Sequence, residues 1–192
     1  MSFRDFDWTL FGLVGALCVV SVLEIYSATL HTKYVGFHTK QIYWITGGVI
    51  AMFILSRIDY HKLIDFVPWA YGFFLFALML VLIPGIGHKA LGARRWIKLG
   101  PLGLFQPSEW MKLVMILAVA RYFANLGARN LTWKEIGKGF ALVGIPMLLI
   151  LKQPDLGTSL TYVPVLVIGM FLGGINFRQA SILVAAAIVL IA

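Results

Sequence analysis

The chain has 192 residues, of which 60% are hydrophobic and only 12% charged, and its mean hydropathy is +0.90. Soluble domains average about 25% charged residues, so this composition excludes an ordinary soluble protein and predicts an integral membrane protein. The net charge of +8 is accompanied neither by a Gly-rich nucleotide loop nor by basic residues interleaved with aromatic ones, and we expect no nucleic-acid partner. The single cysteine, Cys18, lies inside an apolar run and is interpreted as a packing residue.

Seven apolar segments are long enough, with their flanks, to be candidate membrane spans. In chain order they are Trp8–Thr29, Gln41–Leu55, Phe66–Ile83, Ser108–Leu126, Ile136–Leu151, Thr158–Gly174 and Ala180–Ala192. They predict an all-α, polytopic transmembrane helix bundle that forms one domain over residues 1–192. The last segment is apolar to its final residue, so we expect the sequence to be truncated within its seventh span.

Two connections between these segments are long. Residues 85–107 are Gly-rich and basic, whereas residues 127–135 read as a solvated loop in which Thr132, with Glu135 three positions later, predicts a helix N-cap. The 16 Lys and Arg residues divide evenly between the two sides of the membrane, so the positive-inside rule gives no orientation. An anionic substrate bound on the non-cytoplasmic side would explain the unusual positive charge there.

The fourth apolar segment begins with a carboxylate and an ammonium, Glu109 and Lys112. Their i,i+3 spacing places both on one helix face, where they can pair. Ionisable groups at membrane depth cost at least about 2.5–3.5 kcal/mol each, so they usually face a bundle interior or a watery cavity. A structural ion pair and a role in a substrate cavity are both open interpretations.

Three further groups are candidates for chemistry. Arg94, Arg95 and Lys98 could bind phosphate, although arginines beside Trp96 also serve as interfacial anchors. Between the fifth and sixth segments, Pro154 and Gly157 are expected to interrupt the helices, and Asp155 could cap the next helix or belong to a site. The third is Glu24, in the first span, which could be functional or could simply reach water. The scattered histidines lack the spacing of a metal site.

Taken together, these motifs resemble those of the SEDS family of bacterial membrane proteins (shape, elongation, division and sporulation). The resemblance rests on Arg95-Trp96, on Phe105-Gln106-Pro107-Ser108-Glu109 followed by Lys112, on Gln153-Pro154-Asp155-Leu156-Gly157-Thr158-Ser159, and on Asp7-Trp8 with Ile25-Tyr26-Ser27-Ala28-Thr29. It covers the whole chain in order. Gln153 before Pro154 and the short N-terminal tail resemble the family's elongation branch more than its division branch.

The resemblance implies a ten-span peptidoglycan glycosyltransferase of cell elongation and shape, located in the bacterial cytoplasmic (inner) membrane with its N-terminus in the cytoplasm. Such proteins polymerise lipid II on the outer face of that membrane, taking glycan from an undecaprenyl-pyrophosphate donor. The implied partners are a class B penicillin-binding protein and other membrane proteins of the elongation machinery. No cofactor is firmly implied, and a divalent cation stays open.

The resemblance also implies that the matched residues line a polar extracytoplasmic cavity. Cations there would stabilise the departing pyrophosphate, and a carboxylate would deprotonate the attacking hydroxyl. The substrate-binding candidates are Lys40, Arg94, Arg95, Lys98, Glu109, Lys112 and Asp155. Lys40 stands where an arginine is common, which keeps the charge but loses the bidentate fork.

The family's best candidate for the catalytic base is an Asp in an outward loop after the seventh span, which would lie beyond Ala192. The catalytic residue is therefore unknown, and we expect residues 1–192 alone not to polymerise lipid II. Two other classes of function remain open. The protein could be a lipid II flippase or transporter, or it could be a non-catalytic scaffold for a penicillin-binding protein.

Overall fold

The computed structural model describes residues 6–32, 34–90, 92–100, 103–127 and 130–191. Its internal contacts divide the chain into two compact units, Met1–Lys62 and Leu63–Ala192, which are described separately.

The first unit is a helical hairpin of α1 (Trp8–Thr29) and α2 (Phe37–Leu55). Asp7 caps α1 by accepting a hydrogen bond of 2.9 Å from the backbone N–H of Leu10. The amide of Gln41 on α2 donates to the hydroxyl of Ser21 on α1 (3.1 Å), so a polar contact joins the two helices. The first span has the predicted bounds, whereas α2 starts four residues before the predicted position because polar residues 38–40 belong to its first turn.

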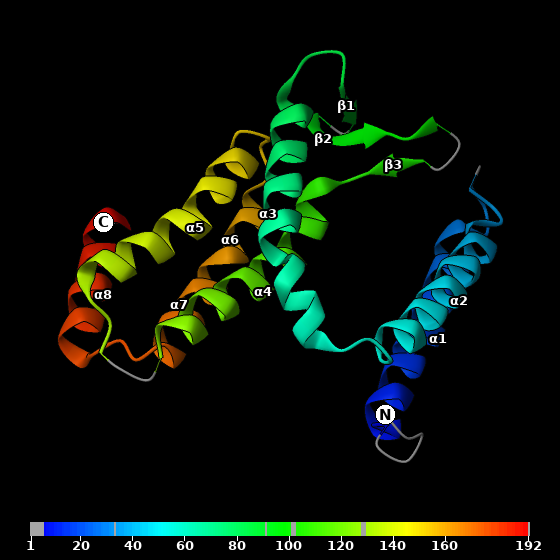
Figure 1. Ribbon diagram of the computed structural model, residues 1–192. Coiled ribbons are helices and arrows are strands. Elements are labelled where there is room, and N and C mark those ends of the chain that lie inside the picture. The colour runs from blue at the N-terminus through cyan, green and yellow to red at the C-terminus, as the bar shows by residue number, and fades with distance from the viewer. Residues whose placement is uncertain (1–5, 33, 91, 101–102, 128–129, 192) are drawn as a thin grey trace. The chain divides into compact units, whose positions relative to one another are not determined.

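In its described residues, the second unit has six helices, which surround a shared apolar core (Figure 1). They are α3 (Tyr60–Leu82, which starts at the unit boundary), α4 (Pro107–Leu126), α5 (Trp133–Leu151), α6 (Leu156–Leu160), α7 (Tyr162–Leu172) and α8 (Phe177–Ile191). The core includes Leu78, Met111, Met115 and Ile150, each with no exposed surface. The predicted helix bundle is confirmed, and by length and hydropathy α1 and residues 61–82 of α3 qualify as membrane spans.

Two local predictions can be compared directly with these helices. The N-cap at Thr132 is confirmed, since Thr132 and Glu135 form a complete capping box at the start of α5. The predicted helix interruption is confirmed for Pro154, which lies between the end of α5 and the start of α6, and is wrong for Gly157, which lies within α6. A second interruption falls at Thr161, where α6 ends and α7 begins.

Residues 85–107, predicted as a loop, fold into a small antiparallel sheet. Its strands are β1 (Gly87–Ala90), β2 (Ala93–Lys98) and β3 (Leu104–Phe105), in the order β1-β2-β3. Three of the six residues of β2 are basic, and its side chains lack the apolar alternation that predicts a strand. The turns on either side of β2 use Gly92 and Gly103, whose φ angles of 82° and 93° suit glycine. The chain enters the sheet from the C-terminus of α3 and leaves it into the N-terminus of α4 (Figure 1).

The long helices α3, α4 and α5 alternate in direction, so the second unit has two chemically different ends. Arg121, near the end of α4, donates to the carbonyl of Ile64 at the start of α3. The Tyr122 hydroxyl donates to the carbonyl of Glu135 at the start of α5 (3.0 Å). We call this the glycine end, because three glycines pack there. The opposite end carries the sheet, and we call it the sheet end.

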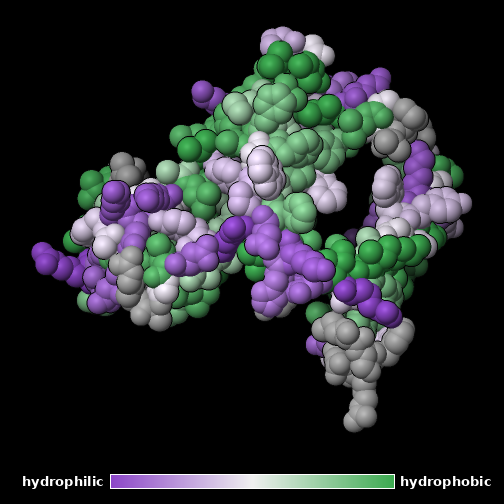
Figure 2. Space-filling model, in the orientation of Figure 1, coloured by the Kyte–Doolittle hydropathy of each residue, from purple (hydrophilic) through white to green (hydrophobic). Residues whose placement is uncertain are grey.

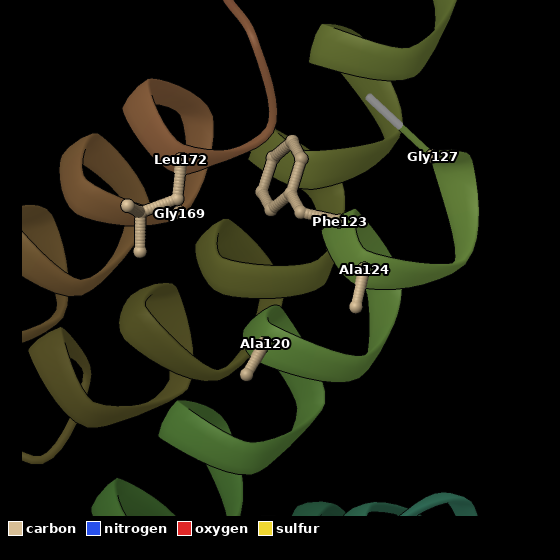
Figure 3. Close-up of a pocket in the computed structure, with 6 residues that line it drawn as sticks. All are labelled: Ala120, Phe123, Ala124, Gly127, Gly169 and Leu172. Carbon is tan, nitrogen blue, oxygen red and sulfur yellow. The ribbon is translucent and has the colours of Figure 1, made fainter. Parts of the chain in front are cut away.

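Packing at the glycine end depends on three glycines around one aromatic ring. Phe123 of α4 is 4% exposed, and a Cβ added at Gly139, Gly169 or Gly173 would lie 3.0, 3.0 or 2.6 Å from its ring. Close helix approach through small residues is a common means of packing transmembrane helices. Beside the ring lies a groove of about 320 Å³, shown in Figure 3. The described residues that line it are Ala, Gly, Phe and Leu, and their side chains offer no polar group for chemistry.

Large apolar patches cover the visible surface, and hydrophilic residues occur in separate groups (Figure 2). Exposed apolar side chains occur on each of the five longest described helices, α1 to α5, for example Leu17 on α1 (70%), Trp44 on α2 (73%) and Trp69 on α3 (80%). Such apolar surface is expected where helices face lipid.

Candidate functional site

The candidate site is at the sheet end and is organised by Arg95 of β2. Its Nε–H donates to the carbonyl of Gln153 (3.3 Å), and its Nη2 donates to the carbonyl of Pro154. Nη1 lies 3.5 Å from Oδ1 of Asp155, forming an ion pair. Three consecutive residues of the α5–α6 turn therefore hold one guanidinium, although 58 residues separate Gln153 from Arg95 in the sequence.

Asp155 has two tasks at once. Its Oδ1 accepts from the backbone N–H of Thr158 (3.1 Å) and its Oδ2 from the Thr158 hydroxyl (2.9 Å), which caps α6. The same carboxylate pairs with Arg95, and its side chain is 8% exposed, against 28% for the arginine. The two interpretations offered by the sequence, capping and a site role, are therefore compatible. A nearly buried carboxylate needs such partners, because an unpaired one would be costly.

Arg94 and Gln153 attach the same region to α3. Nη1 of Arg94 lies 3.4 Å from the carbonyl of Leu82, and Nε2 of Gln153 lies 3.1 Å from the carbonyl of Leu78. Leu78 and Leu82 are four residues apart, so their carbonyls follow each other along one side of α3. Gln153 is 1% exposed, and among the described residues its Oε1 has no hydrogen-bond donor.

Glu109 and Lys112, in the first turns of α4, form the ion pair that their spacing predicts, with Nζ and Oε2 2.8 Å apart. Their side chains are 51% and 31% exposed, so the pair is accessible. Lys112 also lines a small cavity of about 90 Å³ between α4 and α7, together with Met115, Thr161 and Tyr162.

Tyr162 is a residue that the sequence analysis did not select. It is 1% exposed, and its hydroxyl donates to the carbonyl of Ser108, the residue before Glu109 (3.4 Å). It thereby connects the start of α4 with the α6–α7 segment, that is, the two motifs that carry the carboxylates. The available signal was a lone tyrosine among aliphatic residues, two positions after Leu160.

The remaining candidates are placed differently. Lys98 is exposed at the end of β2. Lys40 belongs to the first unit, where its Nζ lies 4.9 Å from the centre of the Phe37 ring and where it lines a cavity of about 420 Å³ with Gln41 and Trp44. Glu24 is exposed on α1. A role in substrate binding stays a prediction for all seven candidates.

Within the described residues, no group of three or more His, Cys, Asp or Glu side chains is arranged to hold a metal ion. Cations held by carbonyls and carboxylates are the main charged feature of the sheet end. The Arg95 guanidinium has five N–H groups on three nitrogens. Each nitrogen makes one contact with the turn, so some N–H groups are left, and the exposed part of the side chain can meet an anion. These features define the class: a helical membrane bundle with a clamped arginine, a lysine–carboxylate pair and an exposed lysine at one end.

Comparison with known proteins gives the family. The family model described as a cell cycle protein, of the FtsW/RodA/SpoVE type, matches residues 5–192. This chain belongs to the FtsW/RodA/SpoVE family, which is the SEDS family that its motifs resemble.

Among curated proteins, the chain is 33% identical over 177 residues to the peptidoglycan glycosyltransferase RodA of Treponema pallidum, covering 91% of this chain and 40% of that protein. It is 33% identical over 186 residues to the peptidoglycan glycosyltransferase MrdB of Escherichia coli K12, covering 97% and 48%. It is also 30% identical over 204 residues to a probable peptidoglycan glycosyltransferase FtsW of Aromatoleum aromaticum, covering 98% and 48%. The chain thus spans about half the length, or less, of these relatives. Similar identities to RodA and FtsW do not separate the two branches.

Solved structures agree with this assignment. The crystal structure of the rod shape determining protein RodA of Thermus thermophilus superimposes with a TM-score of 0.79 at 28% identity, covering 98% of this chain and 60% of that one. A structure of a peptidoglycan synthase complex that coordinates polymerisation and crosslinking gives a TM-score of 0.84 at 29% identity, covering 97% and 53%. The fold is therefore that of the RodA-like helix bundle.

Proposed function

We propose that this chain is the substrate-binding portion of a peptidoglycan glycosyltransferase that polymerises lipid II during cell elongation. It would lie in the cytoplasmic membrane of a bacterium with its N-terminus in the cytoplasm, so that the sheet end faces outward. The observation that carries the proposal is Arg95, which the residues 153–155 turn fixes in place while part of its guanidinium stays accessible.

The chemistry of the donor explains the cations. Glycan transfer from an undecaprenyl-pyrophosphate donor leaves negative charge on the departing pyrophosphate, and fixed positive groups stabilise that charge best when they need not reorganise. Arg95 meets this requirement because it is already held by main-chain carbonyls and by Asp155. Lys112 and the exposed Lys98 would add positive charge at the same end, with Glu109 keeping Lys112 in position.

The carboxylates are better suited to organising the site than to deprotonating the acceptor hydroxyl. Asp155 already accepts two hydrogen bonds and pairs with Arg95, and Glu109 pairs with Lys112. Both carboxylates are thus already engaged by a cation of the chain, which suits them to orient Arg95 and Lys112. The proposed partners are lipid II, a class B penicillin-binding protein and further elongation proteins, which accords with the similarity to a peptidoglycan synthase complex.

Binding of fluorescent lipid II to the chain in lipid nanodiscs tests the proposal. Arg95→Ala should weaken binding about tenfold or more, because charge-assisted hydrogen bonds to phosphate are lost. Arg121→Ala is a matched control, since Arg121 also binds a main-chain carbonyl but at the glycine end. Equal affinities for the wild type, Arg95→Ala and Arg121→Ala would contradict the proposal and favour a scaffold. Movement of labelled lipid II across a vesicle membrane without polymerisation would favour a flippase.

A further inference from the structure

The sheet end contains a closed set of three polar links, which we call the polar triangle. Its corners are β2, the residues 153–155 turn and the last turns of α3. Arg95 links β2 to the turn, Arg94 links β2 to the carbonyl of Leu82, and Gln153 links the turn to the carbonyl of Leu78. The two consecutive arginines therefore attach one strand to two different elements.

We propose that Gln153 is the positioning residue of this site: its side-chain amide fixes the turn on α3 and thereby sets the orientation of the Arg95 guanidinium. The inference rests on the proposed function insofar as Arg95 is taken to bind a phosphate group. Gln153 itself touches no substrate, because it is 1% exposed and acts through its own main-chain carbonyl, which accepts from Nε of Arg95.

Gln153 forms the one link of the polar triangle in which no charged side chain takes part. Its Nε2 donates to a carbonyl 75 residues away in the sequence, and its carbonyl receives the arginine, so one residue joins α3 to β2. The turn has further anchors, such as the backbone N–H of Gln153 on the carbonyl of Ile150 (2.9 Å), but these lie within α5 and its end. Of the described contacts of Gln153, only the side-chain amide holds the turn against α3.

The side-chain oxygen of Gln153 indicates that the residue does more than stabilise the fold. Oε1 of Gln153 is buried without a donor among the described residues, and a buried unsatisfied oxygen costs free energy. An apolar residue of the same shape would avoid that cost, so packing alone would favour methionine here. Fixing the direction of Arg95 gives a reason for an amide at this position.

The matched control is a second buried glutamine at the glycine end. Gln179 is 6% exposed and its Nε2 donates to the carbonyl of Leu131 (2.6 Å), as Gln153 does to Leu78. In contrast to Gln153, its Oε1 is satisfied, since it accepts from the backbone N–H of Asn176 (3.2 Å). Gln179 is thus a structural glutamine with both halves of its amide engaged.

The experiment compares Gln153→Met and Gln179→Met in the full chain, labelled with ¹⁵N-arginine and placed in nanodiscs. Three quantities are measured: the thermal unfolding midpoint, the hydrogen-exchange rate of the Arg95 Nε–H, assigned with Arg95→Lys, and the affinity for geranylgeranyl pyrophosphate. We expect Gln153→Met to accelerate exchange about fivefold or more, because the side-chain hydrogen bond that holds the turn against α3 is lost. The midpoint should change little, because the turn keeps its other anchors. Gln179→Met should lower the midpoint and leave the exchange rate unchanged.

The two proposals fail in distinguishable ways. If Gln153→Met leaves the exchange of Arg95 Nε–H and the probe affinity at wild-type values, the positioning role is refuted whatever the protein binds. If exchange accelerates in Gln153→Met but neither the wild type nor any variant binds the pyrophosphate probe, the positioning geometry is supported and phosphate binding by Arg95 is contradicted. A loss of affinity in Gln153→Met of about threefold or more, with Gln179→Met unaffected, supports both.

Discussion

The two ends of the second unit are held together by different forces. At the sheet end, α3, β2 and the α5–α6 turn are joined by hydrogen bonds and an ion pair centred on Arg95. At the glycine end, α4, α5 and α7 meet around the Phe123 ring, where three glycines allow close contact. Polar links fix the direction of charged groups, whereas tight apolar packing mainly contributes stability. Substitutions at the two ends should therefore separate binding from stability.

The largest effect on stability is expected at Gly169. A Cβ there would collide with Val119 and lie 3.0 Å from Phe123, so Gly169→Val must push α7 away from α4. Overpacking of this kind costs about 1–3 kcal/mol or more. Gly144→Val is the control, because a Cβ at Gly144 would meet nothing within 4 Å. Thermal unfolding in nanodiscs should show a clear loss only for Gly169→Val; equal losses would mean that the glycine packing is not decisive.

The next effect is expected at Asp155, where stability and binding can be separated by the choice of substitution. Asp155→Ala removes the cap of α6 as well as the ion pair with Arg95, and loss of an N-cap costs about 0.5–2 kcal/mol. Asp155→Asn keeps a capping oxygen but removes the charge. We expect Asp155→Ala to be clearly destabilised and Asp155→Asn much less so, with both altering lipid II affinity. An Asn variant as unstable as the Ala variant would show that the ion pair, not the cap, stabilises this turn.

A smaller effect is expected at Tyr162. Tyr162→Phe removes the hydrogen bond from its hydroxyl to the carbonyl of Ser108 and should cost about 0.5–1.5 kcal/mol. Tyr71→Phe provides the comparison, since the Tyr71 hydroxyl donates to the carbonyl of Leu142 (2.8 Å) away from the sheet end. If Tyr162 helps to align the two carboxylate motifs, only its substitution should reduce lipid II affinity as well as the unfolding midpoint. The same affinity in both variants would limit Tyr162 to packing.

The sequence predicted the helices better than it predicted the site. Apolar length reveals a span directly, and the Thr132–Glu135 box reveals where α5 starts, because these signals are local. The sheet was not predicted because β2 combines basic and apolar residues without regular apolar alternation. Its pairing with β1 and β3 depends instead on the glycine turns that connect the strands. The family resemblance implied that Asp155 and Arg95 share one cavity, and the structure pairs the two side chains.

The links through main-chain carbonyls could not have been predicted from residue types. The contacts of Gln153 with Leu78 and of Arg94 with Leu82 use carbonyls, which every residue possesses, so the identities of Leu78 and Leu82 carry no signal. The near-complete burial of Tyr162 likewise depends on how α4 and α7 pack. Residues that act through the backbone of a distant element therefore become visible only in the folded chain.

The smallest effect on stability is expected at the Glu109–Lys112 pair, and it offers the sharpest contrast between stability and binding. The two groups are 51% and 31% exposed, and accessible pairs of this kind contribute only about 0.2–1 kcal/mol. Glu109→Gln should therefore leave the unfolding midpoint almost unchanged. It should nevertheless alter lipid II affinity, because Lys112 loses the partner 2.8 Å away that orients its ammonium beside the cavity between α4 and α7. Lys112→Gln should weaken binding more than Glu109→Gln, since it removes the cation itself. If both variants bind lipid II as tightly as the wild type, the pair is structural, and the phosphate-binding role rests on Arg95 alone.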